Sequence, residues 1–184
     1  EETTLVLQTS TEIVLSDDSI TDFNRVSYIS DLHLMHRIQN AGCKSREDVI
    51  FILQKIIDNI IVNESTKLIL FGGDVSSDFS IFELFVKMLR QSANSCLYGR
   101  PVCIFVLGNH ELWDFSEILF EEIVDKYRTV LKKNGMYLLQ NDLFYLNEYD
   151  DMGIIPYDEL IQSDNQAILE KLRCTRLAIL GGLG

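Results

Sequence analysis

Two runs of apolar residues constrain the fold of this chain more than any other feature. They are KLILFGGD (67–74) and PVCIFVLGNHE (101–111). Neither run alternates between apolar and polar residues, which is typical of strands buried on both faces of a parallel sheet. A third short strand is predicted at RVSYIS (25–30), where β-branched and aromatic residues precede a polar cluster. Parallel strands need long crossover connections, so helices are expected between these runs.

The segments between and after these strands have the periodicity of amphipathic helices. Apolar residues recur every three or four positions within 46–64, 80–93 and 115–134, and Gly135 is placed to end the last of these helices. Strands and helices alternating at this spacing predict right-handed βαβ units. The predicted fold class is therefore α/β, a layered sheet with helices on both faces.

The two ends of the chain give weaker patterns. Residues 136–149 are predicted to form a pair of short strands that turn at Asn141 and Asp142. A helix at about 156–172 and an apolar strand at 176–182 are expected to follow, and partial alternation within 4–16 allows an N-terminal hairpin. Since no repeat or proline-rich linker divides the 184 residues, residues 1–184 are predicted to form a single domain.

Charge and composition disfavour several classes of protein. The formal net charge of −12 makes nucleic acid an unlikely partner, because an acidic surface repels a phosphate backbone. A bound divalent cation can still hold an anionic substrate on an acidic chain. No apolar window is long enough for a membrane span, and the four cysteines contain no C-x-x-C pair. We therefore expect a cytoplasmic protein with reduced thiols and no membrane partner.

Polar residues follow each of the three predicted strands at its carboxyl end. Asp31 and His33 follow the first strand, Asp74 the second, and Asn109 and His110 the third. Because the carboxyl ends of parallel strands share one edge of a sheet, these side chains are expected to converge. Their oxygen and imidazole donors suit manganese, iron or zinc.

Each of these motifs also has a purely structural explanation when taken alone. A loop aspartate in D-x-H can accept backbone N–H bonds, G-G-D can be a turn, and G-N-H-E can cap a helix. The case for a metal site rests on all three motifs occurring in this order, each at a strand end.

The motifs SDLHL, FGGDV and LGNHELWD resemble the D-x-H, G-D and G-N-H-D/E blocks of the calcineurin-like metallophosphoesterases. The resemblance is strong over residues 25–115. It implies a metallophosphoesterase-like fold and an enzyme that hydrolyses phosphomonoester or phosphodiester bonds with two divalent metal ions. By this resemblance Asp31 and His33 bind the first metal, Asp74 bridges both, and Asn109 binds the second.

The resemblance also implies the catalytic residues. His110 is expected beside the scissile phosphate, where it stabilises charge and helps to protonate the leaving oxygen. Glu111 is expected to orient and polarise the His110 imidazole.

The sequence departs from the family after the third block. The family has a lone histidine and a G-H-x-H block there, but no histidine follows His110. His36 could replace a missing ligand or simply be a solvated loop residue. We expect the chain to lack the C-terminal part of its domain, with weak metal binding and self-association through a sheet edge at 176–182. The alternative is a non-catalytic binding or scaffold module that retains the fold.

The class of substrate is open between phosphorylated small molecules, nucleotides and phosphodiesters. Phosphoprotein phosphatases carry an arginine after their G-D block, whereas Val75 to Asp78 contain none here. Trp113 or Phe115 could stack against a base or could pack as core or lid residues.

Overall fold

The computed structural model describes residues 11–14, 25–62, 66–96, 99–161 and 166–182. Its first sheet has the strand order β1-β2-β3-β4-β5, with β2 to β5 parallel and β1 antiparallel at one edge. The strands are β1 (Thr11–Val14), β2 (Arg25–Ile29), β3 (Leu68–Phe71), β4 (Val102–Phe105) and β5 (Tyr137–Leu138). The three strands predicted from apolar runs therefore lie side by side.

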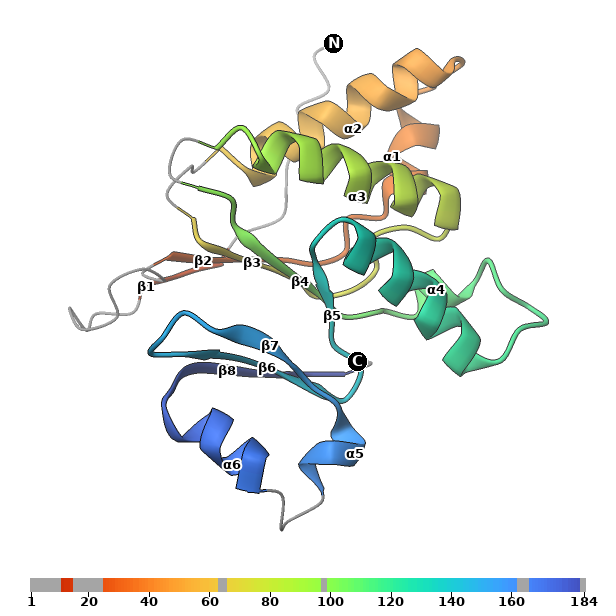
Figure 1. The fold of residues 1–184 in the computed structure, drawn as a ribbon. Coiled ribbons are helices and arrows are strands. Elements are labelled where there is room, and N and C mark those ends of the chain that lie inside the picture. Colours follow the sequence, from red (N-terminus) through yellow and green to blue (C-terminus); the bar gives the residue numbers. More distant parts are fainter. Residues whose placement is uncertain (1–10, 15–24, 63–65, 97–98, 162–165, 183–184) are drawn as a thin grey trace.

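Four helices cover one face of this sheet (Figure 1). They are α1 (Leu34–Asn40), α2 (Arg46–Ile60), α3 (Phe79–Ala93) and α4 (Phe120–Lys133). Ser45 begins α2 with a capping box to Asp48, and the Asp78 carboxylate caps α3 by accepting from the Ile81 N–H. The apolar faces of these helices and of the strands form the largest core cluster. Each cap thus fixes the residue at which its helix begins.

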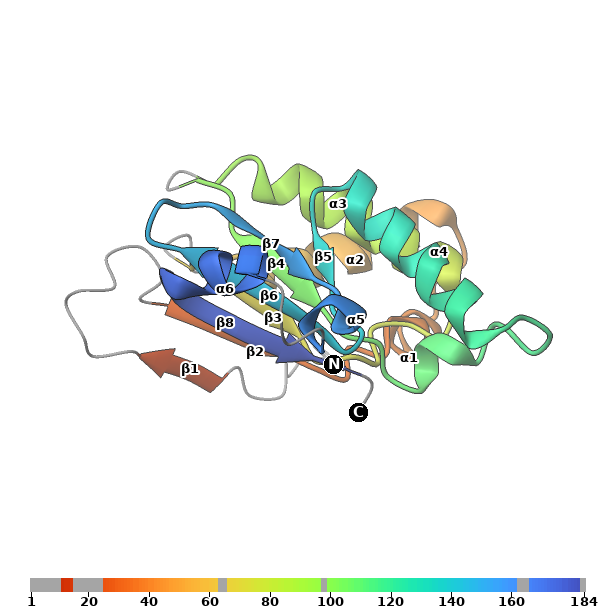
Figure 2. The ribbon, with the colours of Figure 1, turned by 60° about the horizontal axis from the view of Figure 1, so that its bottom comes forward.

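A second sheet packs on the other face of the first (Figure 1), and its strands run roughly along those of the first (Figure 2). It is antiparallel, with the order β7-β6-β8. Its strands are β6 (Asp142–Asn147), β7 (Met152–Ile155) and β8 (Thr175–Gly181). Leu68 and Ile104 of the first sheet belong to one apolar cluster with Phe144 and Leu146 of β6, so the two sheets share a core.

Two short helices, α5 (Tyr157–Leu160) and α6 (Gln166–Arg173), cover the outer face of the second sheet (Figure 1). Ile168 of α6 packs there with Tyr145 and Ile155. The layers are helices, sheet, sheet and helices, which confirms the predicted layered α/β fold, although helices cover only one face of each sheet. Every helix among the described residues is too short or too polar to cross a bilayer.

The predicted strand pair within 136–149 is wrong in its pairing. β5 extends the first sheet beside β4, whereas β6 pairs with β7 and β8 in the second sheet. The chain changes sheets at Asn141, whose φ of 59° is left-handed, and the Asp142 carboxylate accepts from the Gln140 N–H there. The tight turn at this place joins two sheets instead of two strands of a hairpin.

Three other boundaries differ from the prediction. α4 begins at Phe120 instead of 115, and the expected last helix is divided into α5 and α6, with 162–165 outside the described residues. Of the expected hairpin at 4–16, only Thr11–Val14 are described, and they pair antiparallel with β2.

Candidate metal centre

The loops that follow β2, β3 and β4 meet at the carboxyl edge of the parallel strands. Asp31 and His33 leave β2, and their backbone N–H groups donate to the carbonyls of Gly73 at 3.2 Å and Asp74 at 2.9 Å in the loop after β3. The Asp74 Oδ1 atom in turn accepts from the backbone N–H of His110, after β4, at 2.9 Å. The three strand ends are therefore joined by hydrogen bonds, as the convergence argument predicts.

Three side chains from these loops bring possible ligand atoms together. One donor atom each from His33, Asp74 and His110 lies within 4.8 Å of the other two. The rings of His33 and His110 meet edge to face with centroids 4.4 Å apart, and Asp31 Oδ1 lies 3.7 Å from His33 Nε2. Two imidazoles and a carboxylate this close form a donor set that fits a divalent cation of the manganese, iron or zinc type.

The backbone is strained at the same residues. Asp31, His33 and Asp74 have φ values of 56°, 44° and 54°, in the left-handed region that non-glycine residues rarely enter. Such conformations cost roughly 1–3 kcal/mol each and tend to occur at functional sites. His33 also stands at the N-cap of α1 without a capping side-chain bond. The local fold thus directs this imidazole toward Asp74 and His110.

Two glycines allow the loops to approach Asp74. A Cβ atom on Gly108 would collide with the Asp74 carboxylate, and one on Gly73 would come within 2.7 Å of the Gly108 nitrogen. Gly73 also has a φ of 90°, which suits glycine. Larger residues at either position would push Asp74 away from the imidazoles.

Glu111 fastens the loops after β3 and β4 to each other. Its side chain is 0% exposed, and its two oxygens accept four backbone N–H groups. Oε2 accepts from Gly108 at 2.7 Å and Asp74 at 3.0 Å, whereas Oε1 accepts from Val75 at 2.6 Å and Ser76 at 3.1 Å. Burial raises the pKa of this carboxyl group, and the four hydrogen bonds lower it in part.

This geometry gives Glu111 a different role from the expected one. Among the described residues, no hydrogen bond joins its carboxylate to the His110 imidazole, since all its contacts are with backbone N–H groups. Its backbone carbonyl accepts from the hydroxyl of buried Tyr127 on α4 at 3.0 Å. Glu111 therefore positions Asp74 and His110 through the main chain.

Asn109 and His36 lie at the margin of the cluster. Asn109 begins the 3-10 turn His110–Leu112 with an exposed side chain that makes no capping hydrogen bond, so the helix-cap explanation does not account for it. His36 is exposed and its Nε2 lies 3.2 Å from the Asn40 amide nitrogen. His36 does not belong to the group formed by His33, Asp74 and His110.

A hollow of about 650 Å³ opens beside the cluster. His33 and His110 line it together with residues that the sequence did not single out: Met35, Gln39, Ser77, Asp78 and Asp114, besides His36 and Trp113. Asp114 accepts from the Phe79 N–H at 3.0 Å, so it also anchors the start of α3. Their position beside the metal cluster is visible only in the folded structure, because their spacing in the sequence follows no motif.

The two aromatic candidates have different surroundings. Trp113 is 62% exposed, and its ring lies tilted over the His110 imidazole with centroids 3.7 Å apart. Phe115 is half-buried and packs edge to face on Phe79 and Tyr127. Trp113 therefore restricts the His110 ring from the solvent side, whereas Phe115 is a core residue.

The layered fold and the Asp and His donors at the ends of three parallel strands are typical of metal-dependent hydrolases. A comparison with family models matches residues 25–176 to the calcineurin-like phosphoesterase family. The chain belongs to this family, and the match covers β2 to β7. A comparison with curated proteins gave no match.

Proposed function

We propose that this protein is a metal-dependent phosphoesterase that hydrolyses phosphomonoester or phosphodiester bonds. The observation that carries the proposal is the convergence of His33, Asp74 and His110, with ligand atoms within 4.8 Å of one another, beside an open hollow. Family membership supports the same chemistry. A soluble phosphorylated small molecule, a nucleotide or a phosphodiester would enter through the hollow.

Two divalent cations of the manganese, iron or zinc type would bind at this edge. Asp31 and His33 would hold the first, Asp74 would be shared, and Asn109 would hold the second, with manganese as the first ion to test. When bound, such ions withdraw charge from the phosphoryl group and lower the pKa of water, which favours an in-line displacement. The −12 charge of the chain makes these cations the natural means of attracting an anionic substrate.

The protein's own residues would position and protonate the substrate. His110 is held between the His33 and Trp113 rings at the edge of the hollow, where its imidazole can donate a proton to the leaving oxygen. Glu111 would hold His110 and Asp74 in place through its hydrogen bonds to the backbone of both loops. His110 is thus the proposed catalytic residue, with Glu111 as a positioning residue.

The test is hydrolysis of p-nitrophenyl phosphate and bis(p-nitrophenyl) phosphate with added Mn²⁺. Asp74→Asn and His110→Ala should each reduce the metal-dependent rate at least a hundredfold. Asp58→Asn is the matched control, because Asp58 is an exposed carboxylate on α2 whose side chain accepts from Gln54. Equal rates for Asp74→Asn and Asp58→Asn would refute the proposal.

A non-catalytic metal-binding or scaffold module is the second candidate. It is favoured by the sequence itself, whose three histidines all precede Glu111, so the later histidine blocks of the family are not present in it. This candidate predicts Mn²⁺ binding that depends on Asp74 without hydrolysis of either substrate. The same assay therefore separates the two.

We further propose a cytoplasmic location and self-association through β8. No disulfide joins the described cysteines, which a reducing compartment would favour. β8 is an edge strand paired only with β6 among the described strands, and Leu180 on it is 70% exposed. A monodisperse monomer in light scattering would contradict self-association.

A further inference from the structure

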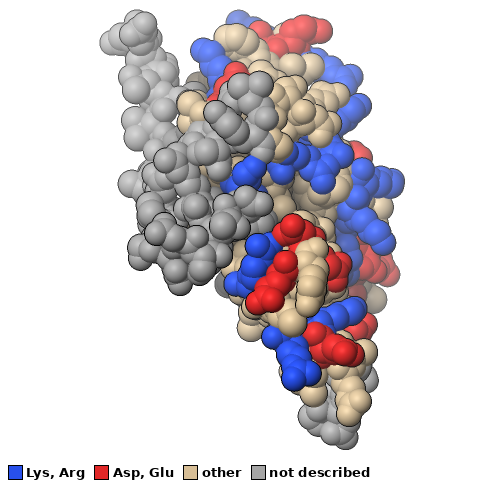
Figure 3. Space-filling view, turned by 60° about the vertical axis from the view of Figure 1, so that its left-hand side comes forward, with Lys and Arg blue, Asp and Glu red and all other residues tan. Residues whose placement is uncertain are grey.

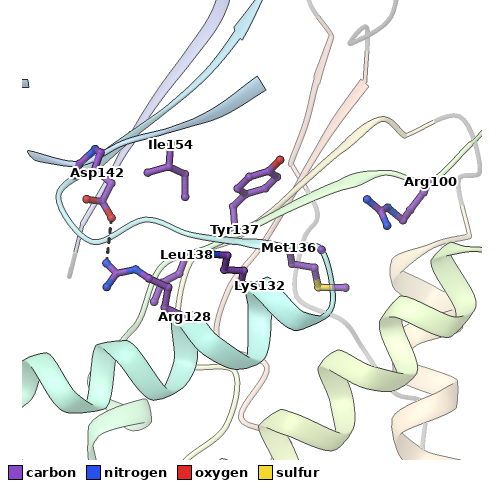
Figure 4. A pocket seen from close by; sticks show the side chains of 10 residues that line it. Arg100, Arg128, Lys132, Met136, Tyr137, Leu138, Asp142 and Ile154 are labelled. Carbon is purple, nitrogen blue, oxygen red and sulfur yellow. Dashed lines mark hydrogen bonds and ion pairs between the residues drawn. The ribbon is translucent and has the colours of Figure 1, made fainter. Parts of the chain in front are cut away.

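A second hollow, of about 660 Å³, lies away from the metal cluster. Arg128 and Lys132 of α4 line one side of it, and Tyr137 of β5 and Ile154 of β7 line the other (Figure 4). Arg100, just before β4, stands at one end (Figure 4). The metal cluster follows the carboxyl ends of the strands, whereas Arg100 precedes the amino end of β4. The two hollows share no lining residue.

The charge of this hollow is opposite to that of the chain. Arg100, Arg128 and Lys132 line it with one carboxylate, Asp142, which gives a formal charge of +2 on a protein of −12. Arg128 is already paired, at 3.4 Å to Asp142 and 2.8 Å to Asp125. The space-filling view in Figure 3 shows that Lys and Arg side chains form a band across one face of the molecule. Cations gathered on an acidic protein indicate a place for an anion.

Two arginines that lack partners among the described residues meet at Gly135, and of these Arg100 lines the hollow whereas Arg90 does not. A Cβ atom on Gly135, which lines the hollow, would lie 3.3 Å from Arg100 Nη1 and 3.4 Å from Arg90 Nη1. Arg90 Nη1 is buried and has no hydrogen-bond acceptor. Neither guanidinium forms an ion pair with a described carboxylate. An anion at Gly135 would pair with the Arg100 guanidinium and offset the repulsion between the two like charges.

The rest of the wall is apolar and held by the core. Met136 and Leu138 are buried, and the Tyr137 ring packs edge to face on Phe144 with centroids 5.1 Å apart. Ile154 and Pro156 complete this side. An apolar wall with a few cationic groups at one end, in a hollow of this size, is typical of a small-molecule site.

We propose that this hollow binds a small organic phosphate of the nucleoside monophosphate class, at a site separate from the metal centre. The phosphate would lie between Arg100 and Lys132. The ring system would lie against Tyr137 and Ile154. No bond is made or broken at this site, which serves to bind the ligand only.

The test is calorimetric titration of the full chain with AMP, in EDTA and in the Asp74→Asn background, so that binding at the metal centre does not contribute. Arg100→Gln and Lys132→Gln should each weaken AMP binding at least tenfold. Both side chains are exposed, so neither change should unfold the protein. Lys133→Gln is the matched control, because Lys133 is exposed on the same turn of α4 and does not line the hollow.

Adenosine and inorganic phosphate are the comparison ligands, and both should bind at least tenfold more weakly than AMP. If adenosine bound as tightly as AMP does, the cations would not contribute to binding. If inorganic phosphate bound as tightly as AMP does, the apolar wall would not contribute. Absence of saturable AMP binding up to millimolar concentration, or equal affinity in Arg100→Gln, Lys132→Gln and Lys133→Gln, would overturn the proposal. AMP binding is measured without hydrolysis. A negative result would therefore refute this proposal and leave the proposed phosphoesterase activity untested.

Discussion

Replacement of Glu111 by glutamine tests how the loops of the metal centre are held together. Each carboxylate oxygen accepts two backbone N–H groups from 2.6 to 3.1 Å. In Glu111→Gln one oxygen becomes an NH₂ group, which cannot accept. Whichever way the amide turns, two buried N–H groups lose their acceptor. They are those of Gly108 and Asp74 or those of Val75 and Ser76.

The magnitude follows from these two N–H groups. A buried donor without an acceptor costs about 1–3 kcal/mol, so the pair costs about 2–6 kcal/mol. Burial raises the pKa of Glu111, which means that the charge itself is poorly solvated, and a neutral glutamine relieves part of this penalty. We therefore expect the lower half of the range, about 2–4 kcal/mol, which is a large part of a typical stability of about 5–15 kcal/mol.

Urea unfolding followed by circular dichroism, in EDTA, measures this loss of free energy. Glu83→Gln is the control, because Glu83 is exposed on α3 and should change the free energy of unfolding by less than about 0.5 kcal/mol. A loss below about 1 kcal/mol for Glu111→Gln, or equal losses for both variants, would refute the backbone role of this carboxylate.

Three further predictions concern residues around the same core. Tyr127→Phe removes the hydroxyl that donates to the Glu111 carbonyl at 3.0 Å and should lower the free energy of unfolding by about 1–2 kcal/mol in urea titrations; no change would show that the bond is unimportant. Gly108→Ala places a Cβ atom against the Asp74 carboxylate and should abolish Mn²⁺ binding measured by calorimetry, whereas wild-type affinity would contradict the packing described here. Burial raises the pKa of Cys103 to about 12, so iodoacetamide at pH 8 should leave this thiol unmodified in mass spectra of the native protein while half-buried Cys43 reacts. The raised pKa means that the folded state favours the protonated Cys103 thiol, so the contribution of this thiol to stability should fall as the pH rises from about 9 toward 12. In melting experiments at different pH values, Cys103→Ala should reduce this fall.

Local patterns predicted α2 and α3 because the signals are themselves local, but they did not predict α1, which begins directly after His33. As the apolar spacing predicted, α2 begins at Arg46 and α3 ends at Ala93. The polar residues after three strands predicted the convergence of His33, Asp74 and His110, since parallel topology leaves them one common edge.

Long-range pairing explains what the sequence did not show. The sequence predicts a strand at Leu143 to Leu146, but its partner β8 lies about thirty residues later. Nothing in the local sequence shows that this strand pairs with β8 instead of β5. The role of Glu111 was missed for a similar reason, because its hydrogen bonds reach residues 35 to 37 positions earlier in the chain. The cations of the second hollow come from α4 and the segment before β4, so only the folded chain brings them together.

The central claim is that three strand ends form one metal site, and calorimetric titration with Mn²⁺ tests it most directly. Wild type and Asp58→Asn should bind Mn²⁺ saturably with the same affinity, whereas Asp74→Asn and His33→Ala should weaken binding at least tenfold. Equal Mn²⁺ affinity in all four proteins, or no saturable binding in any of them, would contradict the claim.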